Sequence, residues 1–109
     1  MDFTVDFSEK ENYYLIKVDG EIDAYHSATF KQKSKEKLSS ADYSKYVIDM
    51  SYVSYIDSAG LGAVVSLLKE ARNLKKELIL VGLQPQVRKI FEMTKLDKIV
   101  KIVDTIEEI

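Results

Sequence analysis

Ser58 is the residue of this sequence whose position most clearly favours chemistry. It directly precedes a strong helical pattern over residues 61–71, so we expect its hydroxyl to be the N-cap of a helix. Free backbone amides and the positive end of the helix dipole also favour a phosphate group at such a position. Ser58 is therefore predicted to accept a phosphoryl group, unless it serves only as a cap.

Two glycines follow Ser58 within the first turn of that helix. Gly60 and Gly62 each cost up to about 1 kcal/mol relative to alanine inside a helix. Their missing side chains would let another molecule approach Ser58 closely. Packing of the turn against a sheet would demand glycine equally, so both explanations stay open.

Two carboxylates are expected beside Ser58. Asp57 precedes it, and Asp23 follows an earlier predicted strand, so the two loops meet at the sheet edge if the strands are neighbours. A phosphate adds about −1.5 to −2 charges. Repulsion of only about 3–4 kcal/mol against a partner docked on this acidic surface would weaken binding by roughly 10²–10³-fold.

Other chemistries lack residues that they require. A serine nucleophile needs a general base, and His26 is the only histidine, while Ile56 occupies the first glycine position of a nucleophile elbow. The stretch from Gly60 lacks the third glycine of a dinucleotide fingerprint. The chain has no cysteine, which excludes thiolate chemistry. We therefore expect no enzyme activity and no cofactor.

Three aspartates define a less favoured alternative. Asp23, Asp49 and Asp57 could hold Mg²⁺, because carboxylates are its preferred protein ligands. Exposed or capping carboxylates explain the same residues, so no metal site is predicted. The alternative is a Mg-dependent phosphoryl-transfer protein with an acidic pocket.

The hydrophobic pattern places these residues on an α/β frame. Strands are predicted over 3–7, 13–18, 46–50, 78–81 and 100–103, and helices over 27–38, 61–71 and 85–94. The pair at 19–20 is expected to end the second strand, residues 51–58 to form a loop, and Asp104 with Glu107 to cap a last helical turn. We predict a single α/β domain over residues 1–109, with helices packed on a mixed sheet whose first strand is antiparallel and the rest parallel.

The composition limits the partners. Sixteen Lys and Arg balance 18 Asp and Glu, unlike the strongly basic face of nucleic-acid binders. No segment approaches the roughly 20 apolar residues of a membrane span, and the first residues lack a secretory pattern. We expect a cytoplasmic protein that binds neither nucleic acid nor membrane. Four lysines within 31–37 are typical of a solvated helix face, or of a docking face for an acidic partner.

Residues 47–62 resemble the signature of the STAS domain, and more narrowly that of the bacterial anti-sigma factor antagonists. The specific part is Asp-Ser-Ala-Gly-Leu-Gly at 57–62, which follows a hydrophobic strand. Gly-Glu-Ile-Asp at 20–23 and the stretch over 87–99 extend the resemblance along nearly the whole chain. The resemblance implies a STAS-like fold.

The resemblance also implies a partner switch. In this family the unphosphorylated antagonist binds an anti-sigma factor that is also a serine kinase of the histidine-kinase-like ATPase type, and a sigma factor is released. Phosphorylation of the signature serine, which is Ser58 here, ends binding, and a PP2C-type phosphatase reverses it. The expected partner-binding residues are Asp23, Ala24, Tyr25, His26, Ser27, Asp57, Ser58, Gly60 and Leu61.

Some positions depart from the family pattern. Lys75 and Lys76 stand where many members have a glycine after the second helix, and Lys95 replaces another common glycine. These changes put the geometry of two loops in question rather than the switch. The family also contains scaffold subunits of stress-signalling or lipid-transport complexes, which stay an alternative function; the serine retained at 58 favours the switch.

Overall fold

Five strands and three α-helices alternate along residues 2–109, the part of the chain that the computed structural model describes. The elements are β1 (Thr4–Glu9), β2 (Tyr14–Ile22), α1 (Ser27–Ser40), β3 (Lys45–Ile56), α2 (Ser58–Asn73), β4 (Glu77–Val81), α3 (Pro85–Met93) and β5 (Lys101–Val103). Two short 3₁₀ helices, η1 (Leu96–Lys98) and η2 (Ile106–Glu108), flank β5. No helix in this range is long and apolar enough to span a lipid bilayer.

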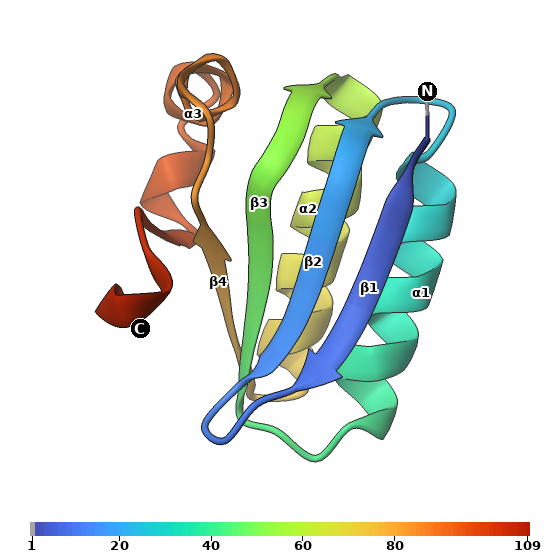
Figure 1. Ribbon diagram of the computed structural model, residues 1–109, viewed down its shortest axis with the longest axis vertical. Helices are drawn as coiled ribbons and strands as arrows, with labels where there is room; N and C mark the ends of the chain where they lie inside the picture. The colour runs from blue at the N-terminus through green and yellow to red at the C-terminus, as the bar shows by residue number, and fades with distance from the viewer. Residues whose placement is uncertain (1) are drawn as a thin grey trace.

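The strands form one mixed sheet in the order β1-β2-β3-β4-β5 (Figure 1). β1 runs antiparallel to β2, and every later pair of neighbours is parallel. The predicted α/β fold, with a mixed sheet that is antiparallel only at its first strand, is confirmed. Because β2 and β3 are parallel neighbours, the chain segments that follow them emerge side by side at one end of the sheet.

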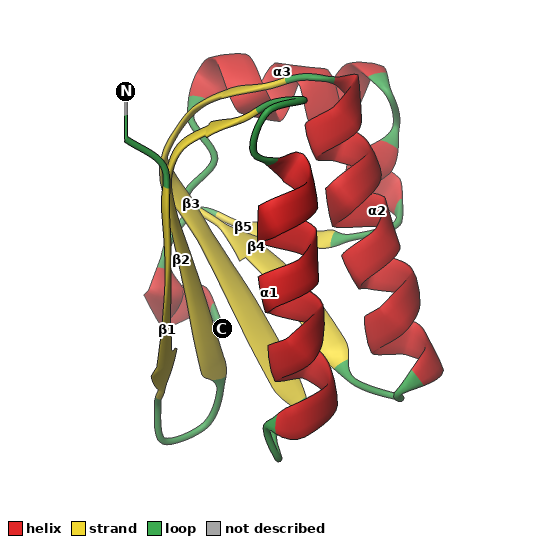
Figure 2. Ribbon diagram, turned by 90° about the vertical axis from the view of Figure 1, so that its right-hand side faces the viewer, coloured by secondary structure: helices red, strands yellow, loops and turns green. Residues whose placement is uncertain are grey.

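The two long helices cover the same face of the sheet (Figure 2). α1 buries Phe30, Ser34 and Leu38, whose spacing of four residues places them on one side of the helix, and α2 buries a broader stripe around Leu67. α3 lies across the end of the sheet, close to the tip of β3 (Figures 1 and 2). Ile106 of η2 packs on the second, smaller core, which includes Val47 and β4 residues.

β2 and β3 extend further than the sequence predicts. β2 continues to Ile22 and β3 to Ile56, so the predicted strand end at 19–20 and the predicted loop at 51–58 are wrong. The last residues of the two strands, Ile22 and Ile56, are buried. Polar and tyrosine side chains in the added part of each strand face solvent. Such a composition is typical of a loop where buried and exposed residues do not alternate strictly. The alternation is broken here because the pairing of β2 with β3 contains two register shifts. The longer strands carry the loops of the candidate site further outward.

Two lysines end helices in the left-handed backbone conformation. Lys75 has a φ of 59° after α2, and Lys95 has a φ of 61° after α3. The amides of Lys75 and Lys76 donate to the carbonyls of Arg72 and Ala71, which completes a Schellman motif. The lysines at 75 and 95 therefore adopt the conformation that glycine adopts most easily.

The ammonium group of Lys76 has a structural role at the end of α1. Its Nζ donates to the carbonyl oxygens of Leu38 at 2.6 Å and Ala41 at 3.0 Å, and lies 3.2 Å from the Tyr46 hydroxyl. Carbonyls in the last turn of a helix have no partner within the helix. Lys76 supplies hydrogen-bond donors to these carbonyls, so its ammonium group already has partners within the fold.

The final helical turn is capped one residue later than predicted. Thr105 and Glu108 form the capping box of η2, in place of the expected pair Asp104 and Glu107. The Thr105 amide donates to Glu108 Oε2 at 2.9 Å.

Candidate functional site

The turn between β2 and α1 lies directly against the start of α2. The Asp57 amide donates to the Ile22 carbonyl at 3.3 Å. Gly60 packs on the same carbonyl, because a Cβ at this position would lie 2.0 Å from the Ile22 oxygen. Packing within the fold therefore demands glycine at 60. The two loops that the sequence places together, if their strands are neighbours, do meet.

The carboxylate of Asp57 joins the two loops. Its Oδ1 accepts from the Gly60 amide and its Oδ2 from the Ala24 amide, each at 2.9 Å. The first of these bonds makes Asp57 the N-cap of α2, so the prediction that Ser58 is the N-cap is wrong. A carboxylate is favoured at this position because it also faces the positive end of the helix dipole.

Ser58 is the first residue of α2 and is exposed to solvent. Capping by Asp57 leaves the Ser58 hydroxyl without a capping role. Among residues 2–109, no hydrogen bond engages this hydroxyl within the protein, and its exposure makes it accessible to another molecule. The first amides of the 16-residue helix and its dipole favour negative charge there.

The side chain of Asp23 organises the turn before α1. Its Oδ1 accepts from the amides of Tyr25 and His26, both at 3.0 Å, and lies 2.9 Å from His26 Nδ1. The His26 ring also stacks on Phe3, with ring centroids 4.5 Å apart. These contacts fix the turn and leave Tyr25 89% exposed. A rigid turn with a projecting aromatic ring is suited to contact a partner.

The electrostatic character of this end is acidic. Asp2, Glu21 and Asp23 line a hollow of about 320 Å³ together with Tyr25 and His26. The carboxylate of Asp57 lies on the other side of the same turn, bonded to Ala24. A negative group added at Ser58 would lie next to the Asp57 carboxylate, which bonds to this turn.

Comparison with family profiles identifies the domain. The profile of the STAS domain matches residues 4–109, which includes both loops. The chain belongs to the STAS domain family. This confirms the resemblance that the signature at 57–62 carries.

Proteins similar to this STAS domain include named anti-sigma factor antagonists. An anti-sigma-B factor antagonist of Listeria monocytogenes is 36% identical over 106 residues, covering 94% of this chain and 90% of that protein. The crystal structure of an anti-sigma factor antagonist from Mycobacterium paratuberculosis is similar with a TM-score of 0.88, at 21% identity, over 98% of this chain and 90% of that chain.

The Bacillus protein SpoIIAA has the same fold in two chemical states. Its phosphorylated form matches with a TM-score of 0.72, at 21% identity, over 98% of this chain and 95% of that chain. Its unphosphorylated form matches with the same TM-score, at 20% identity, over 98% of this chain and 92% of that chain. At these identities the solved structures establish the shared fold alone.

Most of the predicted site residues of this STAS domain gather at one end of the sheet. The exposed or partly exposed ones are Asp23, Ala24, Tyr25, His26, Ser27, Asp57 and Ser58. Gly60 is buried against β2, and Leu61 is half-buried and packs on the main core. These two residues support the site through their packing inside the fold, and their contact with a partner stays a prediction.

Two residues beside Ser58 were not among the predicted contacts. Lys31 of α1 and Gly62 of α2 line a shallow groove of about 290 Å³ between the first turns of the two helices. A Cβ at Gly62 would have no heavy atom within 4 Å, so the fold does not need glycine there. The sequence does contain a signal for both, since Lys31 lies one helical turn after Ser27 and Gly62 one turn after Ser58.

The three aspartates of the magnesium alternative do not form one site in this STAS domain. Asp49 lies in the middle of β3, about 25 Å along the strand from Asp57. Asp49 Oδ1 accepts from the Ser51 amide at 3.0 Å, and both oxygens of Asp57 accept from backbone amides. Residues 2–109 contain no group of three or more His, Cys, Asp and Glu side chains placed to hold a metal ion.

Proposed function

We propose that this STAS domain is an anti-sigma factor antagonist that is switched off by phosphorylation of Ser58. The unphosphorylated form binds an anti-sigma factor that is also a serine kinase of the histidine-kinase-like ATPase type, and a sigma factor is released. A PP2C-type phosphatase restores the binding form. The name of the Listeria relative supports the antagonist role. The observation that carries the switch is the exposed Ser58 hydroxyl at the start of α2, beside Asp57 and the Asp23 turn.

In this proposal the domain is a binding protein and a kinase substrate rather than an enzyme, and it acts in the cytoplasm. The kinase transfers the γ-phosphoryl group of ATP to Ser58 Oγ and releases ADP and the hydroxyl proton. The catalytic groups belong to the kinase. The STAS domain contributes an accessible hydroxyl and a rigid surface that the kinase recognises.

The partner surface combines an exposed aromatic ring with a rigid acidic rim. Tyr25 projects from the turn that Asp23 holds, and Ser58 lies beyond the Asp57 carboxylate that bridges the two loops. Aromatic side chains with little internal freedom are common anchors of protein interfaces. Tyr25 is therefore proposed as the anchor, with Ala24, His26 and Ser27 completing the contact on the α1 side.

A phosphate at Ser58 opposes binding through charge alone. The added −1.5 to −2 charges, about as large as those of two carboxylates, lie next to Asp57, whose carboxylate is bonded to the turn that contains Asp23. Any partner group that docks over this rim must then approach a stronger negative field in a partly desolvated interface. The helix dipole stabilises the phosphate, so modification does not require the helix to unfold.

Phosphorylation is tested by incubating the purified chain with its cognate kinase and ATP, followed by measurement of intact mass. The wild-type chain is expected to gain one phosphoryl group, and Ser58→Ala none. A wild-type chain that gains no mass would favour the alternative, a scaffold subunit of a stress-signalling or lipid-transport complex.

Binding is tested by calorimetry with three variants. Ser58→Asp should weaken kinase binding by roughly 10²-fold, and Ser58→Ala should bind like the wild type. Ser44→Asp, which adds the same charge at an exposed position in the loop between α1 and β3, is the matched control and should leave affinity unchanged. Equal affinities for Ser58→Asp and Ser44→Asp would contradict an electrostatic switch.

A further inference from the structure

A second groove lies at the opposite end of α2 from Ser58. β5 begins opposite Ile79, two positions after the start of β4, so the first residues of β4 pair with β3 on one side and have no strand on the other. The C-terminal part of α2 and the segment after η1 flank this opening. The result is a groove of about 440 Å³ with an apolar floor made by Leu68, Leu78 and Ile99. Leu68 and Leu78 are buried, while Ile99 remains 44% exposed, so Ile99 is the part of the floor that solvent reaches most.

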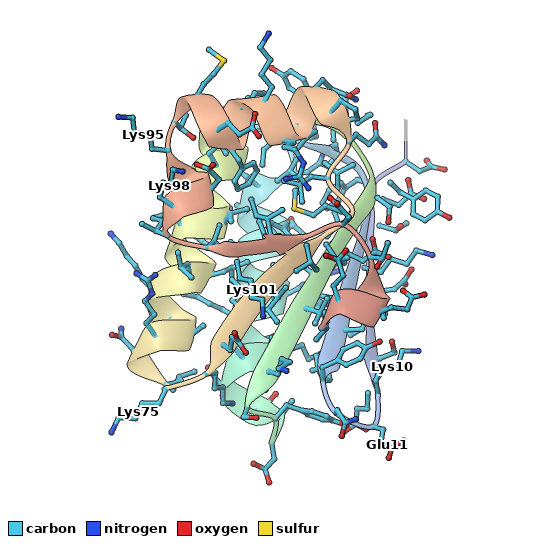
Figure 3. The ribbon with its side chains drawn as sticks, turned by 90° about the vertical axis from the view of Figure 1, so that its left-hand side faces the viewer. Lys10, Glu11, Lys75, Lys95, Lys98 and Lys101 are labelled. Atoms are coloured by element: carbon cyan, nitrogen blue, oxygen red, sulfur yellow. The ribbon has the colours of Figure 1, made fainter. Side chains whose placement is uncertain are left out.

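Cations surround this floor. Arg72, Lys75 and Lys101 line it, and we call this feature the basic groove. Lys95 and Lys98 extend from the same side of the molecule, around η1 (Figure 3). Glu77 is the carboxylate on the lining. The positive charge is local, because the whole chain has a net charge of −2.

These cations are not used by the fold as ion pairs. The ion pairs within residues 2–109 are His26 with Asp23 and Arg88 with Asp104, so the five cations of this side have no carboxylate partner there. Arg72 donates one N–H to the Ile99 carbonyl at 2.6 Å, which orients its guanidinium and leaves other donors free. The ammonium of Lys76, by contrast, is held by the end of α1 and adds little to the groove.

The backbone at Lys75 and Lys95 favours a role for these side chains. Both residues have a positive φ near 60°, a conformation that glycine or asparagine usually occupies at a helix end. Lysine is sterically disfavoured there. Strained positions that the surrounding structure maintains are concentrated at functional sites. Both strained lysines lie on the side of the molecule that carries the basic groove (Figure 3).

We propose that the basic groove binds an acidic peptide segment of a protein partner, with one apolar side chain on the floor and carboxylates against Arg72, Lys75 and Lys101. The recessed apolar floor favours a peptide over phosphates alone, because a side chain buries there while a sugar-phosphate backbone does not. The 16 residues of α2 extend about 24 Å, so this groove and the Ser58 surface can be occupied together. The proposal does not depend on the function of Ser58.

The test is a titration of the full chain with a synthetic peptide in which glutamates flank a central leucine, followed by ¹⁵N NMR at low ionic strength. Saturable shifts are expected at the amides of Arg72, Lys75, Ile99 and Lys101, with none around Ser58. A peptide with lysines in place of the glutamates should cause no shifts. Added salt should weaken binding, because the contacts are largely solvent-exposed ion pairs.

Variants separate the basic groove from general surface charge. Lys75→Gln with Lys101→Gln should weaken peptide binding by about tenfold, taking about two- to fivefold for each exposed ion pair. Lys10→Gln, in the β1–β2 hairpin away from the groove, removes one positive charge, as each of the two groove substitutions does, and should change affinity less than about twofold (Figure 3). Lys75→Gly should fold at least as well as the wild type and still bind the peptide more weakly.

Three results would overturn the proposal. One is the absence of saturable shifts in the groove, and another is an equal loss of affinity in Lys10→Gln. The third is tighter binding at the groove by a single-stranded oligonucleotide, or by phosphatidylserine vesicles, than by the acidic peptide.

Discussion

At the scale of single residues, the two glycines after Ser58 have different reasons to be glycine. Gly60 is buried, and a side chain there would collide with the Ile22 carbonyl. Gly62 is exposed with open space around it, although glycine in the middle of a helix lowers stability. The fold therefore gives no reason for glycine at 62, and we propose that the reason is close approach by a partner.

We predict opposite effects of Gly62→Ala on stability and on binding. The free energy of unfolding should rise by about 0.5–1 kcal/mol, because alanine restricts the unfolded chain and suits the helix. Binding to the kinase partner should weaken, because the new methyl group stands in the groove beside Ser58. Urea denaturation measures the first effect and calorimetry the second.

The matched control is Gly60→Ala, which should destabilise the fold because its Cβ would overlap the Ile22 carbonyl. If Gly62→Ala bound the partner as tightly as the wild type, the hypothesis that a partner approaches closely at Gly62 would be wrong.

At the scale of elements, the helices, the order of elements along the chain and the strand directions follow from the sequence, but the order of the strands in the sheet and the strand lengths do not. The spacing of Phe30, Ser34 and Leu38 predicts the buried face of α1 correctly. The ends of β2 and β3 are hidden because register shifts and exposed polar residues interrupt the period of two. The N-cap is displaced by one residue because Asp57 precedes Ser58, and both residue types cap helices well.

The prediction at this scale concerns the end of α3. Lys95→Gly should raise the free energy of unfolding by about 1 kcal/mol, because glycine has no Cβ to strain the left-handed conformation. Lys98→Gly removes the same charge inside η1, where the backbone is not left-handed, and should not stabilise the fold. The two midpoints of urea denaturation give the comparison. Equal shifts for both variants would mean that charge, and not backbone conformation, sets the effect.

At the scale of the whole molecule, α2 separates two ends of opposite charge. The acidic end contains the turn held by Asp23 and the Asp57 carboxylate, and the other end contains the basic groove. The sequence predicts that the two acidic loops meet if their strands are neighbours, and the order of the sheet meets this condition. It does not predict the basic groove, whose cations Arg72, Lys75 and Lys101 come from α2, the turn after α2 and β5.

We predict that the two ends act independently. Their separation of about 20 Å exceeds the Debye length of about 8 Å at physiological salt, so charge at one end is screened from the other. Ser58→Asp should therefore weaken kinase binding but leave the affinity for the acidic peptide within about twofold of the wild type. Parallel calorimetric titrations of the variant with each ligand measure both. A matching loss of peptide affinity would indicate coupling through α2.

The contact between Gly60 and the Ile22 carbonyl has a consequence for how the state of Ser58 is sensed. With no room for even a methyl group between helix and strand, the segment bearing the hydroxyl cannot move closer to β2 when a phosphate is attached. In the proposed switch, a partner would meet the same backbone surface before and after modification, with the phosphate group as the difference. The partner would then detect the phosphate on first contact, without a prior rearrangement of the domain.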